Sequence, residues 1–340
     1  MNFFTKIDIP SSDLQIDYKS KLAFFGSCFA DNISAQFASR KFKVLANPFG
    51  TVYNPLSTAM QIKAIANGKI FGEKDVFQDA QGLWHCWNAH GSLSAKSRKE
   101  CLDKLNAAAH EARDFLQNAD VVFITLGTAF VYFLKESGIA VSNCHRQDPN
   151  MFIRKMISVD HAAEALKSIV RDLQKIKCQE GSENRGPHIV FTVSPLRHMS
   201  DGAHNNTLSK ATLQLAIDKV IQEIASPSAR NDAGFLNHKN TITYFPSYEI
   251  VMDELRDYRF YESDMIHLSK TAEEYIFERM AETYCDGKTR DNIKQVEKFL
   301  KSANHRIQDA DSPATAAFLQ KLHAEAEKLE SQIAGLHLDM

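Results

Sequence analysis

Five short apolar segments run through the first three quarters of the chain. Four of them are continuous runs, at residues 21–25 (KLAFF), 121–126 (VVFITL), 189–193 (IVFTV) and 241–245 (TITYF), and a weaker one lies at residues 43–46. Strands that are covered on both faces of a parallel sheet have this pattern, because neither face meets solvent. The pattern therefore predicts a sheet of five mainly parallel strands.

Helical periodicity fills the intervals between these strands. Asn54 and Pro55 provide an N-cap and a first helical position for a helix over residues 55–66. Further helices are predicted at residues 31–39, 98–116, 160–175, 209–224 and 271–284. This alternation predicts an α/β protein with helices on both faces of an open sheet. Residues 130–141 (FVYFLKESGIAV) instead indicate a hairpin outside the sheet, turning at residues 136–138.

The segment after residue 287 has a different pattern. Apolar residues recur at spacings of three and four, at Ile293, Val296, Leu300, Ala303 and Ile307 and, after a break at residues 311–313, at Leu319, Leu322, Ala326, Leu329, Ile333 and Leu336. Two amphipathic helices joined by a Pro-containing turn explain it. We predict a main domain at residues 1–287 and a helical hairpin at 288–340. The hairpin packs on its own domain, joins two copies as a homo-oligomer, or recruits a partner.

Composition narrows the class of protein. The 340 residues are 44% hydrophobic and 24% charged, as in ordinary globular proteins, and the net charge of −2 argues against a nucleic-acid partner. The cysteines have no paired spacing, which argues against a metal site or a disulfide framework; they are Cys28, Cys86, Cys101, Cys144, Cys178 and Cys285. No signal-peptide pattern or membrane-length apolar run is visible. We expect a cytoplasmic protein with no cofactor and no membrane span.

The segments that follow the strands are the places to look for chemistry, because ligands of open parallel sheets bind beyond the carboxyl ends of the strands. After the first strand come residues 26–30 (GSCFA) and a helix. Gly26 permits a tight turn there. The first-turn N–H groups and the helix dipole would lower the pKa of the Cys28 thiol and could hold an oxyanion. The alternative is an ordinary strand-to-helix turn with an inert cysteine.

Three other strand ends carry polar or turn-forming residues. Residues 47–55 place two Asn-Pro pairs around Gly50, whose N–H could approach a substrate oxygen. Thr128 follows the third strand and offers a hydroxyl. Arg197 and His198 lie in the loop after the fourth strand, where they could line a pocket or face solvent.

Asp264 and His267 follow the last strand at a spacing that suits an acid–base pair. The carboxylate can accept the Nδ1–H of the imidazole, which fixes the tautomer and leaves Nε2 free as a base. Asp201 and His204 have the same spacing, so spacing alone does not decide between the pairs. Position favours the later pair, because it could reach back to a nucleophile at the end of the first strand.

The motif at residues 26–30 is the one that names the GSCFA family, which this chain resembles. The resemblance continues in order through residues 47–50 (NPFG), 53–55 (YNP), 84–90 (WHCWNAH), 126–128 (LGT), 192–198 (TVSPLRH) and 264–267 (DMIH). It covers about residues 20–285 and leaves the tail after Gly287 outside. GSCFA proteins are similar to the SGNH/GDSL hydrolases, which hydrolyse or transfer acyl groups. The resemblance implies their flavodoxin-like three-layer α/β/α fold.

The resemblance also assigns catalytic roles to single residues. The nucleophile of the wider group falls on Cys28, with Ser27 as the alternative. Its Asp-x-x-His motif falls on Asp264 and His267, and its oxyanion-hole glycine falls on Gly50. A cysteine nucleophile paired with a histidine would resemble Cys–His enzymes more than serine esterases.

Two departures from the wider group bear on the substrate site. The third block of the wider group has an Asn two residues after its Gly, whereas this chain has Ala129 at that position. Either Thr128 or a backbone N–H takes the place of that Asn, or the oxyanion hole is incomplete. Residues 84–90 have no equivalent there, and their tryptophans form either a substrate wall or part of the core. His90 is the member expected to face the site. The candidate oxyanion and substrate-binding residues are Gly50, Asn54, His90, Thr128, Arg197 and His198.

We therefore predict an acyl-ester hydrolase or acyltransferase of SGNH type. Its substrate would be an acylated small molecule or glycan, or a thioester, and no metal is expected to take part. The alternative is a non-catalytic SGNH-like binding or scaffold protein, which the replacement at Ala129 and the uncertain nucleophile motivate.

Overall fold

The computed structural model describes residues 5–10, 12–177, 186–225, 241–304 and 312–338. Its central sheet consists of β1 (Lys21–Gly26), β2 (Lys43–Ala46), β5 (Val121–Leu126), β9 (His188–Val193) and β10 (Ile242–Tyr244). The strands lie in the order β10-β9-β5-β1-β2, and every neighbouring pair is parallel. The five predicted strands are confirmed, and their order is that of a flavodoxin-like sheet.

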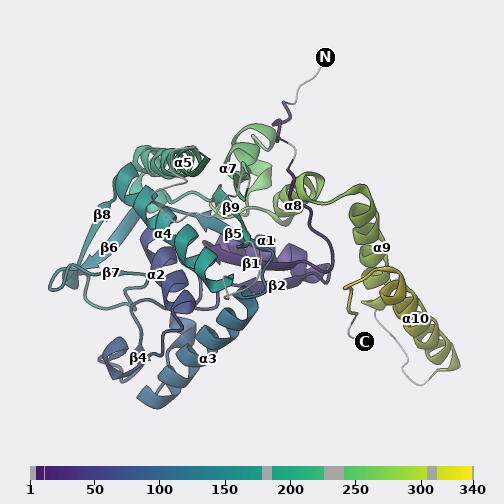
Figure 1. Cartoon of the computed structure of the whole chain (residues 1–340), viewed down its shortest axis with the longest axis horizontal. Coiled ribbons are helices and arrows are strands. Elements are labelled where there is room, and N and C mark those ends of the chain that lie inside the picture. Colours follow the sequence, from purple (N-terminus) through teal and green to yellow (C-terminus); the bar gives the residue numbers. More distant parts are fainter. Residues whose placement is uncertain (1–4, 11, 178–185, 226–240, 305–311, 339–340) are drawn as a thin grey trace.

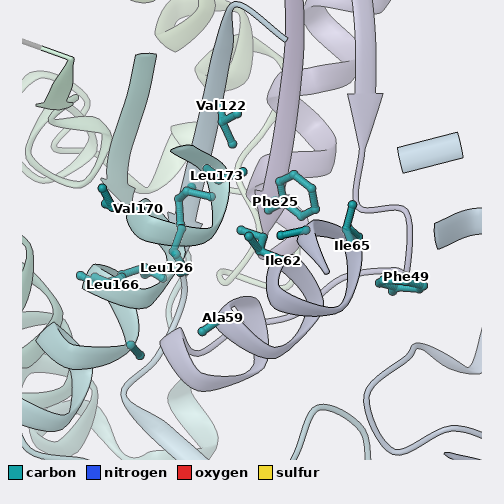
Figure 2. Packing of buried hydrophobic residues seen from close by; sticks show 14 of the residues in the cluster. Phe25, Phe49, Ala59, Ile62, Ile65, Val122, Leu126, Leu166, Val170 and Leu173 are labelled. Carbon is teal, nitrogen blue, oxygen red and sulfur yellow. The ribbon is translucent and has the colours of Figure 1, made fainter. Parts of the chain in front are cut away.

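Helices cover both faces of this sheet because successive strand residues point to opposite sides. In β1, Ala23 and Phe25 belong to one hydrophobic core, whereas Leu22 and Phe24 belong to the other. The first core is covered by α2 (Pro55–Ala66), α3 (Arg98–Leu116), α4 (Val159–Lys177) and α5 (Ala203–Ala225). Figure 2 shows Ile62 of α2 near Phe25. The second core is covered by α1 (Cys28–Ser39) and α8 (Lys270–Tyr284) (Figure 1). The protein is therefore a three-layer α/β/α sandwich.

The helix boundaries show how local chemistry sets the ends of the elements. α2 has the predicted bounds because the Asn54 side chain accepts a hydrogen bond from Ser57 N at 2.9 Å and Pro55 takes the first position. α1 begins at Cys28, three residues before the predicted start. α5 begins at Ala203 rather than at residue 209. The functional loops are thus shorter than the sequence pattern suggested.

A second, antiparallel sheet leaves the sandwich after β5. It contains β6 (Phe130–Leu134), β7 (Ala140–Val141) and β8 (Phe152–Met156) in the order β7-β6-β8. The predicted hairpin is confirmed as β6 and β7, whereas β8 was not predicted. The short strands β3 (Phe77–Gln78) and β4 (Trp84–His85) pair separately. Shorter helical segments are η1 (Glu73–Asp75), η2 (Gly91–Leu93), η3 (Pro149–Met151), η4 (Met199–Asp201), α7 (Ser247–Glu249), η5 (Ile250–Glu254) and η6 (Tyr258–Phe260).

Two amphipathic helices close the chain, as predicted: α9 (Gly287–Ala303) and α10 (Pro313–Gln332). They lie at the end of the molecule opposite β6–β8 (Figure 1). Their apolar stripes, with Val296 and Leu329 among them, belong to the same core as α1 and α8. Ile307, and Asp311 of the expected break, lie outside the described residues, whereas Ser312 is the N-cap of α10 and Pro313 its first residue. The boundary at residue 287 and a role in oligomerisation remain predictions. No helix in the described part of the chain has the length and apolar character needed to cross a membrane.

Candidate active site

A cleft of about 550 Å³ opens at the carboxyl edge of the central sheet. Its floor is built from the ends of three strands, with Cys28 after β1, Thr128 after β5 and Ser194 after β9. β1 is the strand from which the chain passes to β2 on one side and later to β5 on the other. Ligands of doubly wound folds bind at such a switch point. The cleft is therefore where the fold places a ligand.

The turn between β1 and α1 brings Cys28 into this cleft. Gly26 has a φ of 133°, and a β-carbon there would lie 2.0 Å from the Thr125 carbonyl oxygen, so only glycine fits. Ser27 is the N-cap of α1 in an extended conformation, without a capping hydrogen bond from its side chain. Cys28 is thus the first helical residue, where backbone N–H groups have no partners within the helix.

A polar network holds this turn against the loop after β2. The Asn47 side chain accepts from Gly26 N at 2.8 Å and donates from Nδ2 to Asp31 Oδ1 at 2.7 Å. The hydroxyl of Thr51 donates to Asp31 Oδ2 at 2.9 Å, and Val52 N donates to Gly26 O at 2.9 Å. The two loops therefore form one rigid unit, and a carboxylate lies one helical turn from Cys28.

The Cys28 thiol does not have the lowered pKa that the helix N-terminus led us to expect. Burial raises its pKa, and the Asp31 carboxylate adds to the rise. The N–H groups of Cys28 and Phe29 act in the opposite direction, as does Lys210, but they do not outweigh burial. This corrects the expectation of a thiolate, and the resting thiol is protonated at neutral pH.

His267 and Asp264 form the predicted pair. His267 Nδ1 lies 2.6 Å from Asp264 Oδ2, and Asp264 Oδ1 accepts from the N–H groups of Ile266 and His267 at 2.8 and 2.9 Å. The side-chain hydrogen bond with His267, together with these backbone bonds, lowers the pKa of Asp264 to about 2. The ionised carboxylate orients the ring so that Nε2 is the free nitrogen. His267 lines the same cleft as Cys28 and Ser27.

Two of the candidate oxyanion donors, Gly50 and Thr128, have backbone N–H groups that are already hydrogen-bonded within the protein. Gly50 N donates to Asn47 O at 2.6 Å, and Gly50 does not line the cleft, so its N–H is not free for a substrate oxygen. Thr128 lines the cleft, but its N–H donates to Tyr53 O at 2.8 Å. Its hydroxyl accepts from Phe130 N at 3.1 Å. These contacts correct the donor role expected of Gly50.

Asn54 is the side chain whose geometry suits an oxyanion. Its Oδ1 accepts the capping bond from Ser57 N, which identifies Nδ2 as the atom that remains to donate. No partner of this Nδ2 occurs in the part of the chain that the structure describes. Asn54 is buried and lines the cleft, so its amide N–H groups are a ready donor for a substrate oxygen.

A model of the GSCFA family matches residues 21–280 of this chain. The chain belongs to the GSCFA family. A search of curated proteins gives no match to this GSCFA protein. Among solved structures, an acetyl xylan esterase (Est2A) from the rumen bacterium Butyrivibrio proteoclasticus matches at 13% identity with a TM-score of 0.32. The match covers 81% of the GSCFA chain and 64% of the esterase, so the chain spans less than two thirds of that structure.

The other predicted binding residues of the GSCFA protein are gathered at the same cleft. His90, Arg197 and His198 all line it. Burial lowers the pKa of His198 to about 4, so its ring is neutral at physiological pH. A β-carbon built on Gly127 would lie 3.3 Å from His198 Nε2 and 3.4 Å from Ser27 Cβ, which places both residues beside this glycine.

The other members of the 84–90 block do not line the cleft. His85 is buried, with Nδ1 2.6 Å from Ser94 Oγ and Nε2 2.8 Å from Asp79 Oδ2. Trp87 stacks on Phe77 with ring centroids 3.7 Å apart. These contacts hold the β3–β4 region together.

Two residues of the site were missed in the sequence. Lys210 of α5 is 1% exposed, and its Nζ donates to Gly127 O and Ser194 O at 2.6 Å each. Burial lowers its pKa to about 7. Arg154 of β8 lines the cleft and pairs with Asp201 at 2.6 Å. Their sequence positions gave no signal, because a lysine in a helix and an arginine in a strand are ordinarily exposed. Within the described residues, no group of three or more His, Cys, Asp or Glu side chains could hold a metal ion.

Proposed function

We propose that this GSCFA protein is an acyl-ester hydrolase or acyltransferase in which Cys28 is the nucleophile and His267 its base. One observation supports this most strongly: Cys28, the Asp264-bound His267 and the Asn54 amide belong to a single cleft. A nucleophile, an oriented base and oxyanion donors are the groups that acyl transfer requires.

The raised pKa of Cys28 defines the first step. Because the thiol is protonated at rest, its proton must leave as the sulfur attacks, and His267 Nε2 accepts it. The bond from Sγ to the substrate carbonyl carbon forms, and the carbonyl π electrons move to oxygen. The N–H of Cys28 and the Asn54 amide donate to that oxyanion. The site then works as a serine esterase does, by general-base catalysis rather than through a preformed thiolate.

The remaining steps reverse this proton transfer. His267 returns the proton to the leaving-group oxygen as the carbon–oxygen bond breaks, which leaves a thioester on Cys28. A water molecule then attacks, His267 takes its proton, and the carboxylic acid leaves as the thiol is restored. If a hydroxyl compound replaces water, the same steps transfer the acyl group to it. Hydrolase and transferase therefore differ only in the acceptor.

Ser27 is the alternative nucleophile. Its hydroxyl is buried and has no hydrogen-bond partner among the described residues. The neutral ring of His198 lies beside Gly127, as Ser27 does, and would be its base. Cys28 is preferred because it is more exposed to the cleft and begins the helix, next to the first-turn N–H groups.

The test uses 4-nitrophenyl acetate and mass spectrometry of the acid-quenched protein. We expect an acetyl adduct on Cys28, loss of turnover in Cys28→Ala and His267→Ala, and turnover retained in Ser27→Ala. Cys144→Ala is the matched control, because Cys144 is another thiol of the same cleft and has no proposed role. An adduct and turnover that persist in the Cys28→Ala, Ser27→Ala double variant would refute the proposal.

A non-catalytic binding protein is the second candidate, and the raised pKa of the Cys28 thiol is the observation that favours it. This function predicts no acyl adduct with any ester. A ligand bound in the cleft would still block iodoacetamide labelling of Cys28. An acyl adduct on Cys28 therefore distinguishes the enzyme, which forms it, from the binding protein, which does not.

A further inference from the structure

The charges that line the cleft are all of one sign. Two arginines, Arg154 and Arg197, line it together with His90, His198 and His267, and no Asp or Glu side chain lines it within the described residues. Asp201 pairs with Arg154 and Asp264 bonds to His267. Asp31, one helical turn from Cys28, accepts hydrogen bonds from Asn47 and Thr51 and does not line the cleft. A bound ligand therefore meets cationic and neutral groups.

Arg197 has no carboxylate partner in the part of the chain that the structure describes. Its guanidinium lies over the ring of Tyr261 at 4.6 Å and near the ring of Tyr258 at 5.6 Å. Nη2 donates to the carbonyl of Met265, and Nε is buried without a partner in the described part of the chain. These contacts fix the plane of the group but include no carboxylate. A guanidinium held in this way presents a rigid fork to an oxyanion.

Arg154 has a different environment. It reaches the cleft from β8, lies 4.3 Å from the centroid of the Phe130 ring, and bonds through Nη1 to Asp201, whose side chain is 2% exposed. The carboxylate offsets its charge, so Arg154 contributes a positioned donor rather than a net charge. Arg197 is therefore the cation that selects a ligand.

We propose that the cleft binds acyl substrates that carry an oxyanion group, and that Arg197 recognises this group. The inference rests on the proposed acyl transfer at Cys28. It adds the substrate class: the acyl chain or its alcohol bears a carboxylate or a phosphate. The Met265 contact gives Arg197 a second role, because it links the cation to the turn that carries Asp264 and His267.

The test compares two esters that differ only in charge, mono(4-nitrophenyl) adipate and its methyl ester at the distal carboxylate. We expect kcat/KM to favour the anionic ester by about ten- to hundredfold, the size of one charge-assisted hydrogen-bonded pair. Arg197→Met should abolish the preference and Arg197→Lys should restore part of it. Arg259→Met is the matched control, since Arg259 is an exposed arginine of the neighbouring segment outside the cleft.

The ratio of kcat/KM for the anionic ester to kcat/KM for the neutral ester distinguishes two roles of Arg197: recognition of the substrate anion and positioning of the His267 turn. If Arg197 only holds the His267 turn, Arg197→Met lowers kcat for both esters equally and the preference stays, which would overturn the proposal. Equal kcat/KM values in the unaltered protein would overturn it as well.

A second measurement does not depend on turnover. Adipate should slow iodoacetamide labelling of Cys28, whereas dimethyl adipate should not, and Arg197→Met should remove the protection. Inorganic phosphate in place of adipate separates phosphate from carboxylate recognition. If no ester is turned over, the proposed acyl transfer is refuted, and the slowing of Cys28 labelling by an anion then tests the anion site by itself. The same labelling rate with adipate, with phosphate and with neither would refute the anion site.

Discussion

Lys210 should give the folded protein a distinctive dependence of stability on pH. Its side chain is buried beneath the cleft and bonds two backbone carbonyls, and burial lowers its pKa from 10.5 to about 7. Between these values the unfolded chain binds a proton that the folded chain does not. The unfolding free energy must therefore increase as pH rises from 7 toward 10.5, and it decreases again as pH is lowered toward 7.

The magnitude follows from the same two values. Each pH unit well inside the window contributes about 1.4 kcal/mol, so the gain from pH 7.5 to 8.5 is about 1 kcal/mol. Lys210→Met removes the ionisable group and with it this slope. The substitution also leaves two buried carbonyls without a donor, at a cost of about 1–3 kcal/mol each. The change with pH of the difference in unfolding free energy between the two proteins therefore reports the ionisation of Lys210. The size of that difference at any one pH does not.

Urea unfolding at a series of pH values, under reducing conditions, measures this slope. Lys219→Met is the control, because Lys219 lies on the same helix but is half exposed, and its hydrogen bond with Asp160 raises its pKa. It stays charged in both states between pH 7.5 and 8.5, so its difference curve should be flat over that interval. If the unfolding free energy of the unaltered protein minus that of Lys210→Met is flat or falls with pH, Lys210 is not held as a buried amine of lowered pKa.

Three further substitutions test the geometry of the site. Gly26→Ala should destabilise the fold by about 2–5 kcal/mol in thermal unfolding, because its β-carbon would meet the Thr125 carbonyl oxygen and its φ is positive; a loss below 1 kcal/mol would contradict this. Asp31→Asn should speed iodoacetamide labelling of Cys28 at pH 8, since the carboxylate raises the thiol pKa, and unchanged labelling would argue against that influence. Asn54→Asp should keep the helix cap and hence the Tm, but lower kcat about 10²- to 10³-fold by removing the oxyanion donor; unchanged ester turnover would exclude the amide from the oxyanion hole.

Local sequence patterns predicted most of the scaffold. The apolar runs of β1 and β5 gave their bounds to within one residue, because strands buried on both faces consist mostly of apolar residues. The Asn54-Pro55 pair located the start of α2 because a cap acts within one helical turn. β8 was missed because residues 152–156 (FIRKM) are mostly exposed, and the strand is defined by its pairing with β6.

The segments proposed to be catalytic were also visible in the chain, since Cys28, Asp264 and His267 follow strand ends in recognisable motifs. What the sequence determined is therefore the set of elements and the edge of the sheet at which the candidate site lies. These depend on interactions within a few residues.

Tertiary structure alone decided the electrostatics of the site. Lys210 is buried where Gly127 and Ser194, the residues that directly follow β5 and β9, present their carbonyls to it. The Cys28 thiol is protonated because burial, with the Asp31 carboxylate, raises its pKa. The N–H of Gly50 is taken up by a hydrogen bond within its own loop, whereas the Asn54 cap leaves the amide nitrogen to donate in the cleft. Burial and the choice of hydrogen-bond partner depend on groups far apart in the sequence, so no local pattern carries them.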